Sequence, residues 1–121
     1  EKEIRHLLTC ESGLKGYLNT NDFRQVIQMA STNKDAQTVL DSMIHQIIKE
    51  SGSMFAILKG NVHGLILTGG LAKSDELCSR LKASITFIST FFIYPGAFEL
   101  EALAEGTYRA LSGLCPILEY K

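Results

Sequence analysis

Apolar positions recur at intervals of three and four residues in five stretches of the chain, and this spacing is typical of amphipathic helices. The first stretch ends before Gly13, and the second begins at Phe23 after a run of turn residues. The longest runs from Asp35 to Leu58 along one apolar stripe. The fourth follows Ser74, and the fifth spans Glu99 to Ser112. In this last helix we expect the following residues to face inward: Leu100, Leu103, Ala104, Thr107 and Leu111.

Two further segments have the composition of buried strands. Val62 to Thr68 is a short apolar run closed by two glycines, and Ile85 to Tyr94 is rich in β-branched and aromatic residues. A third segment, Leu14 to Leu18, is short and is also interpreted as a strand. From the longest helix onward the order is helix, strand, helix, strand, helix. This order predicts an α/β fold with parallel strands joined by crossover helices.

Composition narrows the partners that such a fold can have. The chain has 121 residues, with 12 Lys and Arg against 13 Asp and Glu, and a formal net charge of -1. Nucleic-acid-binding domains usually carry a basic excess, so we expect no nucleic-acid partner. The apolar runs are far shorter than the roughly 20 residues of a membrane-spanning helix, so we expect no membrane partner. The chain begins with Glu1 instead of Met, which favours a piece of a larger parent.

The cysteines and histidines do not have the spacing of a metal site. Cys10, Cys78 and Cys115 form no CxxC pair, and no histidine clusters with them in the sequence. We expect three buried or half-buried thiols in a reducing cytosol. His45 lies at the edge of the longest apolar stripe, where a hydrogen-bonded structural role is favoured over a catalytic one.

A candidate ligand site lies at the end of the first predicted strand. Ligands in open α/β sheets bind outside the carboxyl ends of the strands. Gly69 and Gly70 allow a ligand to approach the backbone because neither has a Cβ. Ser74 and the start of the next helix supply hydrogen-bond donors. The alternative is that the two glycines serve only close packing between strand and helix.

A second candidate is the polar cluster that precedes the helix at Phe23. We expect Thr20 or Asn21 to cap this helix, with Asp22 in its first turn, where a carboxylate complements the helix dipole. A cation in the same turn is disfavoured, so helix stability does not account for Arg24. Its guanidinium suits a phosphate or a stacked base.

These segments resemble a known family. Leu67 to Ala72 looks like the adenosine motif of the superfamily of acetate and sugar kinases, Hsp70 and actin. Ser12 to Val26 is similar to the butyrate kinase segment GGLxAYLGTNDxREV, and Ser42 to Gly70 resembles the long helix and strand of that family. Tyr94 to Gly113 resembles the family's ending, YPGEDExxALAEGxxRxLxG. The resemblance covers nearly the whole chain and implies part of a ribonuclease-H-like, actin-like ATPase domain.

The resemblance also implies an adenosine site for ATP or ADP with two walls. The residues that match one wall are Asp22, Phe23 and Arg24, and those that match the other are Gly69, Gly70, Leu71 and Ser74. Glu99 matches the carboxylate that helps to hold magnesium in related acetate kinases, although helix capping explains it equally well.

Three positions depart from the family pattern. Asn19 replaces a glycine, and Asn tolerates the left-handed backbone conformation better than other non-glycine residues. Ala97 and Phe98 replace an acidic pair, which weakens the expectation of a magnesium site near Glu99.

By resemblance, the parent protein is a cytoplasmic butyrate kinase, which phosphorylates butanoate with ATP and Mg²⁺. The family's N-terminal domain holds the phosphate loop, the catalytic Arg and His and the pocket for the short-chain carboxylic acid, and nothing in residues 1–121 matches it. We therefore expect the C-terminal, adenosine-binding portion, inactive by itself. The alternative is a catalytically dead remnant that binds nucleotide or self-associates. Family members dimerise through this portion, which implies a homodimer.

Overall fold

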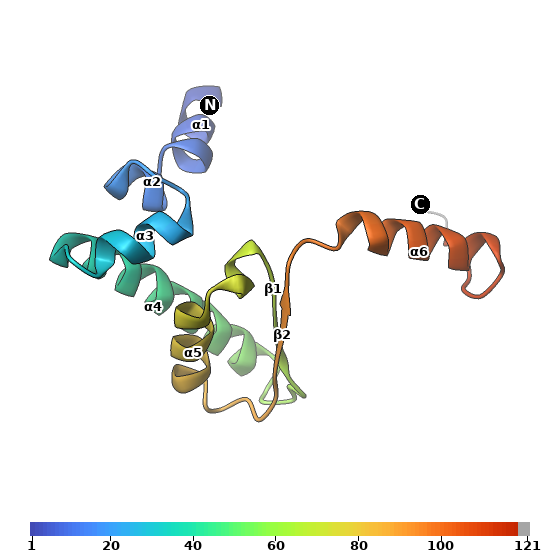
Figure 1. Ribbon diagram of the computed structural model, residues 1–121. Helices are drawn as coiled ribbons and strands as arrows, with labels where there is room; N and C mark the ends of the chain where they lie inside the picture. The colour runs from blue at the N-terminus through green and yellow to red at the C-terminus, as the bar shows by residue number, and fades with distance from the viewer. Residues whose placement is uncertain (119–121) are drawn as a thin grey trace.

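A computed structural model describes residues 1–118 and shows a small parallel sheet with most of the helices on one side of it (Figure 1). Strands β1 and β2 pair in parallel from Leu65 opposite Phe91 to Gly69 opposite Pro95, and α5 connects them. The predicted α/β fold with parallel strands is therefore confirmed. The elements in chain order are α1 (Lys2–Cys10), α2 (Gly13–Leu18), α3 (Phe23–Ala30), α4 (Lys34–Ile57), β1 (Leu65–Gly69), η1 (Gly70–Lys73, a 3-10 helix), α5 (Asp75–Ser84), β2 (Phe91–Pro95) and α6 (Glu99–Leu111).

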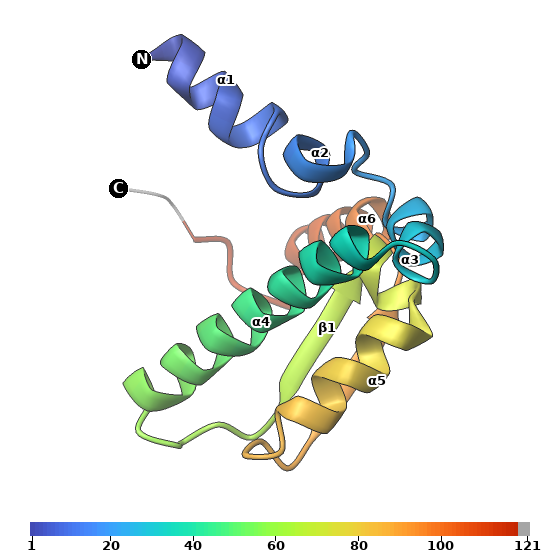
Figure 2. The ribbon, with the colours of Figure 1, turned by 90° about the vertical axis from the view of Figure 1, so that its left-hand side faces the viewer.

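The hydrophobic core lies between the sheet and helices α3, α4 and α5. Figure 2 shows α4 and α5 on the same side of β1. The inward residues of the sheet, Leu65, Leu67 and Phe91, pack against a buried cluster. The members of that cluster are Phe23, Val26, Ala30, Ala36, Leu40, Ile44, Leu77, Leu81, Ile85 and Ile88. Within residues 1–118, no helix is long and apolar enough to cross a membrane.

Short polar side chains define where the helices begin. Asn33 caps α4, because its Oδ1 accepts hydrogen bonds from the backbone N–H groups of Asp35 at 2.8 Å and Ala36 at 3.1 Å. The predicted cap at Ser74 is confirmed, since its Oγ accepts from the N–H of Leu77 at 3.3 Å. Asn19 ends α2 in the left-handed conformation, with φ of 57°.

The three predicted strands differ from the structure in different ways. The strand predicted from Val62 to Thr68 is present but runs from Leu65 to Gly69. Leu14 to Leu18 is helical, so the strand prediction was wrong. Both leucines are half-buried at an i, i+4 spacing that lets them pack against the core. The strand predicted from Ile85 begins only at Phe91. Ile85 and Ile88 lie in the connection and are buried, so their apolar character reflects burial in the core.

Helix α6 was predicted correctly as a helix, but the inward orientation of its apolar residues was wrong. Leu100, Leu103 and Leu111 are 81%, 67% and 80% exposed, and Ala104 and Thr107 are exposed as well. The reason is that α6 projects away from the sheet and the other helices (Figure 1), and it buries no residue in the described part of the chain.

Two titratable side chains also lie elsewhere than predicted. Cys10 is exposed near the end of α1, whereas Cys78 is buried and Cys115 is half-buried as expected. Burial is the main cause that raises the pKa of the Cys78 thiol, and the carboxylate of Asp75 raises it further. His45 is exposed, and its ring has no hydrogen-bond partner among residues 1–118, so the structural role predicted for it was wrong. It follows the buried Ile44 around the helix and therefore faces solvent.

Candidate functional site

An open cleft of about 690 Å³ lies between the start of α3 and the turn that follows β1. Its volume falls within the range of roughly 300–1,000 Å³ that is typical of small-molecule sites. The residues that line it are Asn21, Asp22, Phe23, Arg24, Ile27, Gly70, Leu71, Lys73 and Ser74. The structure thus brings together two polar turns that lie almost fifty residues apart in the sequence.

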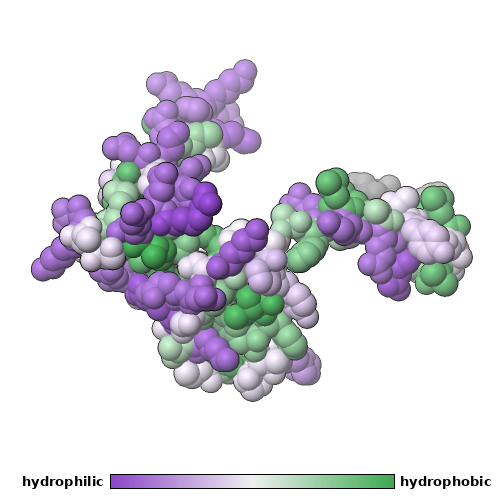
Figure 3. Space-filling model, viewed as in Figure 1, coloured by the Kyte–Doolittle hydropathy of each residue, from purple (hydrophilic) through white to green (hydrophobic). Residues whose placement is uncertain are grey.

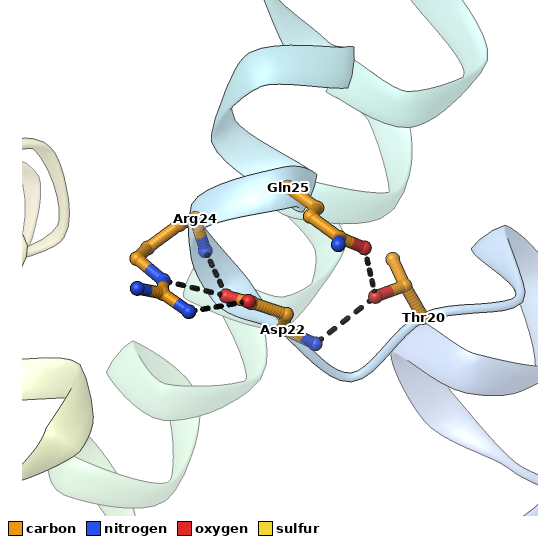
Figure 4. Close-up of polar contacts among 4 residues, drawn as sticks. All are labelled: Thr20, Asp22, Arg24 and Gln25. Atoms are coloured by element: carbon orange, nitrogen blue, oxygen red, sulfur yellow. Dashed lines mark hydrogen bonds and ion pairs between the residues drawn. The ribbon is translucent and has the colours of Figure 1, made fainter.

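A hydrogen-bonded turn forms the first wall of the cleft (Figure 4). Thr20 Oγ1 accepts a hydrogen bond from the N–H of Asp22 at 3.1 Å and donates one to Gln25 Oε1 at 2.7 Å. Asp22 Oδ1 accepts from the N–H of Arg24 at 3.0 Å. Asp22 is therefore the cap of α3, and the prediction of Thr20 or Asn21 as the cap was wrong. The extended backbone of Asp22, with ψ of 107°, places it just before the first turn.

The guanidinium of Arg24 folds back onto the carboxylate of Asp22 (Figure 4). Its Nε lies 3.1 Å from Asp22 Oδ1, and its Nη2 lies 2.7 Å from Oδ2. This hydrogen bonding lowers the pKa of the Asp22 carboxyl and raises the pKa of Arg24. The Asp22 carboxylate is thus a local partner of Arg24, and this pairing was not predicted from the sequence. The Arg24 side chain is still 91% exposed and lines the cleft, so contact with a ligand remains a prediction.

The second wall begins where β1 ends. Gly69 has φ of 83°, a left-handed conformation that favours glycine, and it exchanges backbone hydrogen bonds with Gly96 at 3.0 and 3.1 Å. Gly70 follows at the edge of the cleft, where a Cβ would meet no heavy atom within 4 Å. A side chain placed there would extend into open space, so any ligand in the cleft can approach the Gly70 backbone.

Leu71 and Ser74 complete this wall. Leu71 is exposed beside the cleft and offers apolar contact surface. Ser74 Oγ accepts the hydrogen bond that caps α5, and this leaves its hydroxyl proton available for donation. The wall therefore combines an open backbone, an apolar side chain and a donor.

The cleft contains every residue predicted for the adenosine site except Gly69, which shapes the turn without lining the cleft. Phe23 is only 8% exposed, so most of its ring belongs to the core. Three further residues line the cleft and were not predicted for the site: Asn21, Ile27 and Lys73. Ile27 was detectable, because it lies one helical turn after Phe23, whereas the other two are simply neighbours of predicted residues.

A metal site is not formed by this part of the chain alone. Within residues 1–118, no group of three or more His, Cys, Asp or Glu side chains could hold a metal ion. Glu99 is exposed in the first turn of α6, after a cap residue, Phe98, that makes no side-chain capping bond. A contribution of Glu99 to magnesium binding remains a prediction.

A second open cleft, of about 570 Å³, lies between α2 and α4. The residues that line it are Gly13, Leu14, Tyr17, Thr38, Val39, Ser42, Met43 and Gln46. No charged side chain is among them. The first cleft is therefore the better candidate for a ligand that carries phosphate groups.

Comparison with known proteins identifies relatives of the whole chain. A family profile with the description "Acetokinase family" matches residues 1–90. The chain is 40% identical over 114 residues to a probable butyrate kinase of Clostridium botulinum, and the match covers 93% of this chain and 32% of that protein. It is 41% identical over 113 residues to probable butyrate kinase 2 of Caldanaerobacter subterraneus, with the same two coverages. It is 36% identical over 121 residues to butyrate kinase 1 of Clostridium acetobutylicum, covering 99% of this chain and 34% of that protein.

The chain thus spans about a third of the length of the relatives that it matches. The predicted resemblance to this group is confirmed, and the parallel strands with their crossover helix agree with the expected actin-like ATPase fold. The profile match takes in the cap of α3, strand β1 and the turn at Gly70. With three quarters of its residues inside that match, the chain belongs to the acetokinase family.

Proposed function

We propose that this chain is the adenosine-binding portion of a butyrate kinase, which transfers a phosphoryl group from ATP to butanoate. The observation that carries the proposal is the cleft between Asp22 and Gly70, which is lined by two turns that are distant in sequence. The names of the relatives supply the reaction: each of the three compared above is a butyrate kinase by name.

The residues of the cleft suit the nucleoside end of a nucleotide. The backbone at Gly70 is open, so a planar base can lie against it without meeting a Cβ. Leu71 and Ile27 offer apolar surface, and the Ser74 hydroxyl can donate a hydrogen bond to a ribose oxygen. These contacts bind and orient the nucleotide, which is the protein's main task in phosphoryl transfer.

Other parts of the proposed reaction need groups outside this chain. Residues 1–118 form no cluster of three or more side chains that could hold Mg²⁺, and the resemblance implies that the acid pocket and the catalytic side chains belong to the family's N-terminal domain. We therefore expect no turnover of butyrate and ATP by residues 1–121. A coupled assay for ADP release tests this expectation, with a heat-killed sample as the control. Turnover above that control would contradict the proposal that the reaction needs groups outside this chain. We also propose that the parent butyrate kinase is located in the cytoplasm.

Titration with ADP tests the site directly. We expect saturable binding to the isolated chain with a dissociation constant of about 0.1 mM or weaker, because only one side of the nucleotide is held. Gly70→Val should abolish it, because the added side chain would occupy the space beside the backbone where the ligand is proposed to lie, while its Cβ would meet no protein atom within 4 Å. Gly106→Val is the matched control, because Gly106 is on α6 and its Cβ would also meet nothing.

The outcomes of this titration separate the alternatives. No saturable binding at millimolar ADP would remove the proposed site. Equal binding by Gly70→Val and the unchanged chain would place ADP elsewhere on the molecule. Circular dichroism of both variants shows whether the helices are retained, so that a loss of binding is not caused by unfolding.

Self-association is a second candidate function, and the exposed face of α6 favours it. Leu100, Leu103 and Leu111 leave apolar surface uncovered on this helix, and Figure 3 shows hydrophobic patches along α6 and over the sheet region. A second copy of the chain in a two-fold homodimer would cover this surface on both copies at once. This role would persist in a catalytically dead remnant.

A further inference from the structure

The cleft has one charged side chain that was not among the residues predicted for the adenosine site. Three charged residues line it: Asp22, Arg24 and Lys73. Both carboxylate oxygens of Asp22 accept hydrogen bonds from Arg24, at 3.1 and 2.7 Å, so these two charges compensate each other. Lys73 takes part in none of the ion pairs formed among residues 1–118. The lining therefore carries a net positive charge at Lys73.

The helix start beside Lys73 adds to the positive charge at this end of the cleft. It is the last residue of η1 and directly precedes Ser74, the cap of α5. The start of an α-helix has a partial positive charge, so a lysine there is locally unfavourable. Asp75 and Glu76 in the first turn of α5 offset the dipole, but neither lines the cleft. The end of the cleft at Lys73 is thus suited to an anionic group.

We propose that the Lys73 ammonium binds a phosphate group of the nucleotide and gives the cleft its preference for phosphorylated over unphosphorylated nucleosides. The inference rests on the proposed function, because the nucleoside must occupy the same cleft. Lys73 is better placed for this role than Arg24, whose guanidinium already has a carboxylate partner. A lysine is a compact point charge with three donors, which suits the freely rotating oxygens of a phosphate.

Binding of adenosine and ADP to the same variants tests the proposal. Lys73→Gln removes the charge and keeps a polar side chain of similar length. We expect it to weaken ADP binding about fivefold, as for a solvent-exposed ion pair, and to leave adenosine binding unchanged. Lys73→Arg should retain ADP binding. Lys82→Gln is the matched control, because Lys82 lies in the last turn of α5 and does not line the cleft.

Salt dependence gives a second readout. Added salt should weaken ADP binding to the unchanged chain more than adenosine binding, because salt screens the contact between ammonium and phosphate. In Lys73→Gln this difference should shrink. A role of Lys73 in local structure alone would change adenosine and ADP binding equally, and that result would overturn the proposal.

Failure of this inference can be told apart from failure of the proposed function. If adenosine and ADP both bind but Lys73→Gln changes neither affinity, only the assignment of Lys73 is wrong. If neither compound shows saturable binding to the unchanged chain, the cleft is not a nucleotide site and both proposals fall. If Lys82→Gln weakens ADP binding as much as Lys73→Gln, the effect belongs to net charge and the assignment is again overturned.

Discussion

Helices α4 and α6 have similar apolar patterns but different surroundings. In the first half of α4, Ala36, Leu40 and Ile44 are 0%, 2% and 3% exposed. In α6, Leu100 and Leu103 have the same three- to four-residue spacing and remain mostly exposed. The difference lies in what surrounds each helix. Helix α4 contacts both α3 and α5, whereas α6 extends away from the rest of the chain (Figure 1).

The comparison shows what an amphipathic pattern can and cannot predict. Apolar spacing identifies the face of a helix that must be covered, because most of the stability of a helix in a protein comes from packing of that face. It does not identify the element that covers it. For α4 the cover is within the chain, and for α6 it is not within residues 1–118.

Equivalent truncations in the two helices should therefore have very different costs. Leu40→Ala should lower the free energy of unfolding by about 2–5 kcal/mol, because it leaves a cavity in a packed core. In the monomeric chain, Leu103→Ala should change it by no more than about 0.5 kcal/mol, as for an exposed site. Urea unfolding of both variants measures the difference. A loss at Leu103 as large as the loss at Leu40 would show that α6 is packed in solution.

The same distinction explains how much of the fold could be predicted. The helices from Phe23, Asp35, Ser74 and Glu99 were found because each combines a periodic stripe with turn or capping residues. The helix α2 was missed, since it has only six residues and two glycines. Gly16 is required there, because a Cβ would lie 2.8 Å from the backbone oxygen of Glu11, and this contact depends on a chain path that the sequence does not reveal.

A charge on α6 tests whether a second copy covers its apolar face. The proposed homodimer predicts an apparent mass of about twice the 13.3 kDa of one chain by light scattering at micromolar concentration. Leu103→Glu should return the mass to that of one chain, because a carboxylate cannot be buried in an apolar interface without a partner. Ser112→Glu, just beyond the end of α6, serves as the control for added charge. A monomer before any substitution would contradict the proposal.

Candidate site residues were easier to predict than the contacts among them. The turns around Asp22 and Gly70 were identified, and the structure places them on opposite walls of one cleft. The pair between Asp22 and Arg24 was not predicted, although the partners are only two positions apart, which is less than one helical turn. Lys73 was not identified either as a charge without an ion-pair partner among residues 1–118. Such a lack can be judged only after the fold has placed the carboxylates.

The caps of α3 and α6 provide a smaller contrast. Asp22 caps α3 with its side chain, whereas Phe98 at the start of α6 makes no such bond. Asp22→Ala should lower the free energy of unfolding by about 1 kcal/mol, because the N–H of Arg24 loses its acceptor. Phe98→Ser should raise the helix content of α6 without changing the unfolding midpoint. Circular dichroism and urea titration measure the two effects, and equal midpoint shifts would contradict the contrast.

The smallest expected effect concerns an ion pair that joins α4 to α5. Arg80 Nη2 lies 2.6 Å from Asp41 Oδ1, whereas the pair of Arg109 with Glu105 lies within α6 at 3.8 Å. Hydrogen bonding from Arg80 is the main cause that lowers the pKa of the Asp41 carboxyl below its ordinary value of 3.8. The contribution of this ion pair to the free energy of unfolding is therefore complete above pH 3.8, the ordinary pKa of the carboxyl. It is lost as the pH falls through the lower pKa that Asp41 has in the folded state.

Asp41→Asn should remove this part of the pH dependence. At about pH 7 the substitution should cost about 0.5 kcal/mol, because both partners are partly exposed and water screens the pair. The cost should vanish at a pH below the pKa of Asp41 in the folded state. At that pH Asp41 of the unchanged chain is protonated and is as neutral as the asparagine of the variant. Glu105→Gln is the matched control and should cost less at about pH 7, since its pair connects no two elements. Urea midpoints of the three proteins across this pH range measure the difference. A cost for Asp41→Asn that does not change with pH would mean that the bond between Asp41 and Arg80 does not depend on the carboxylate charge.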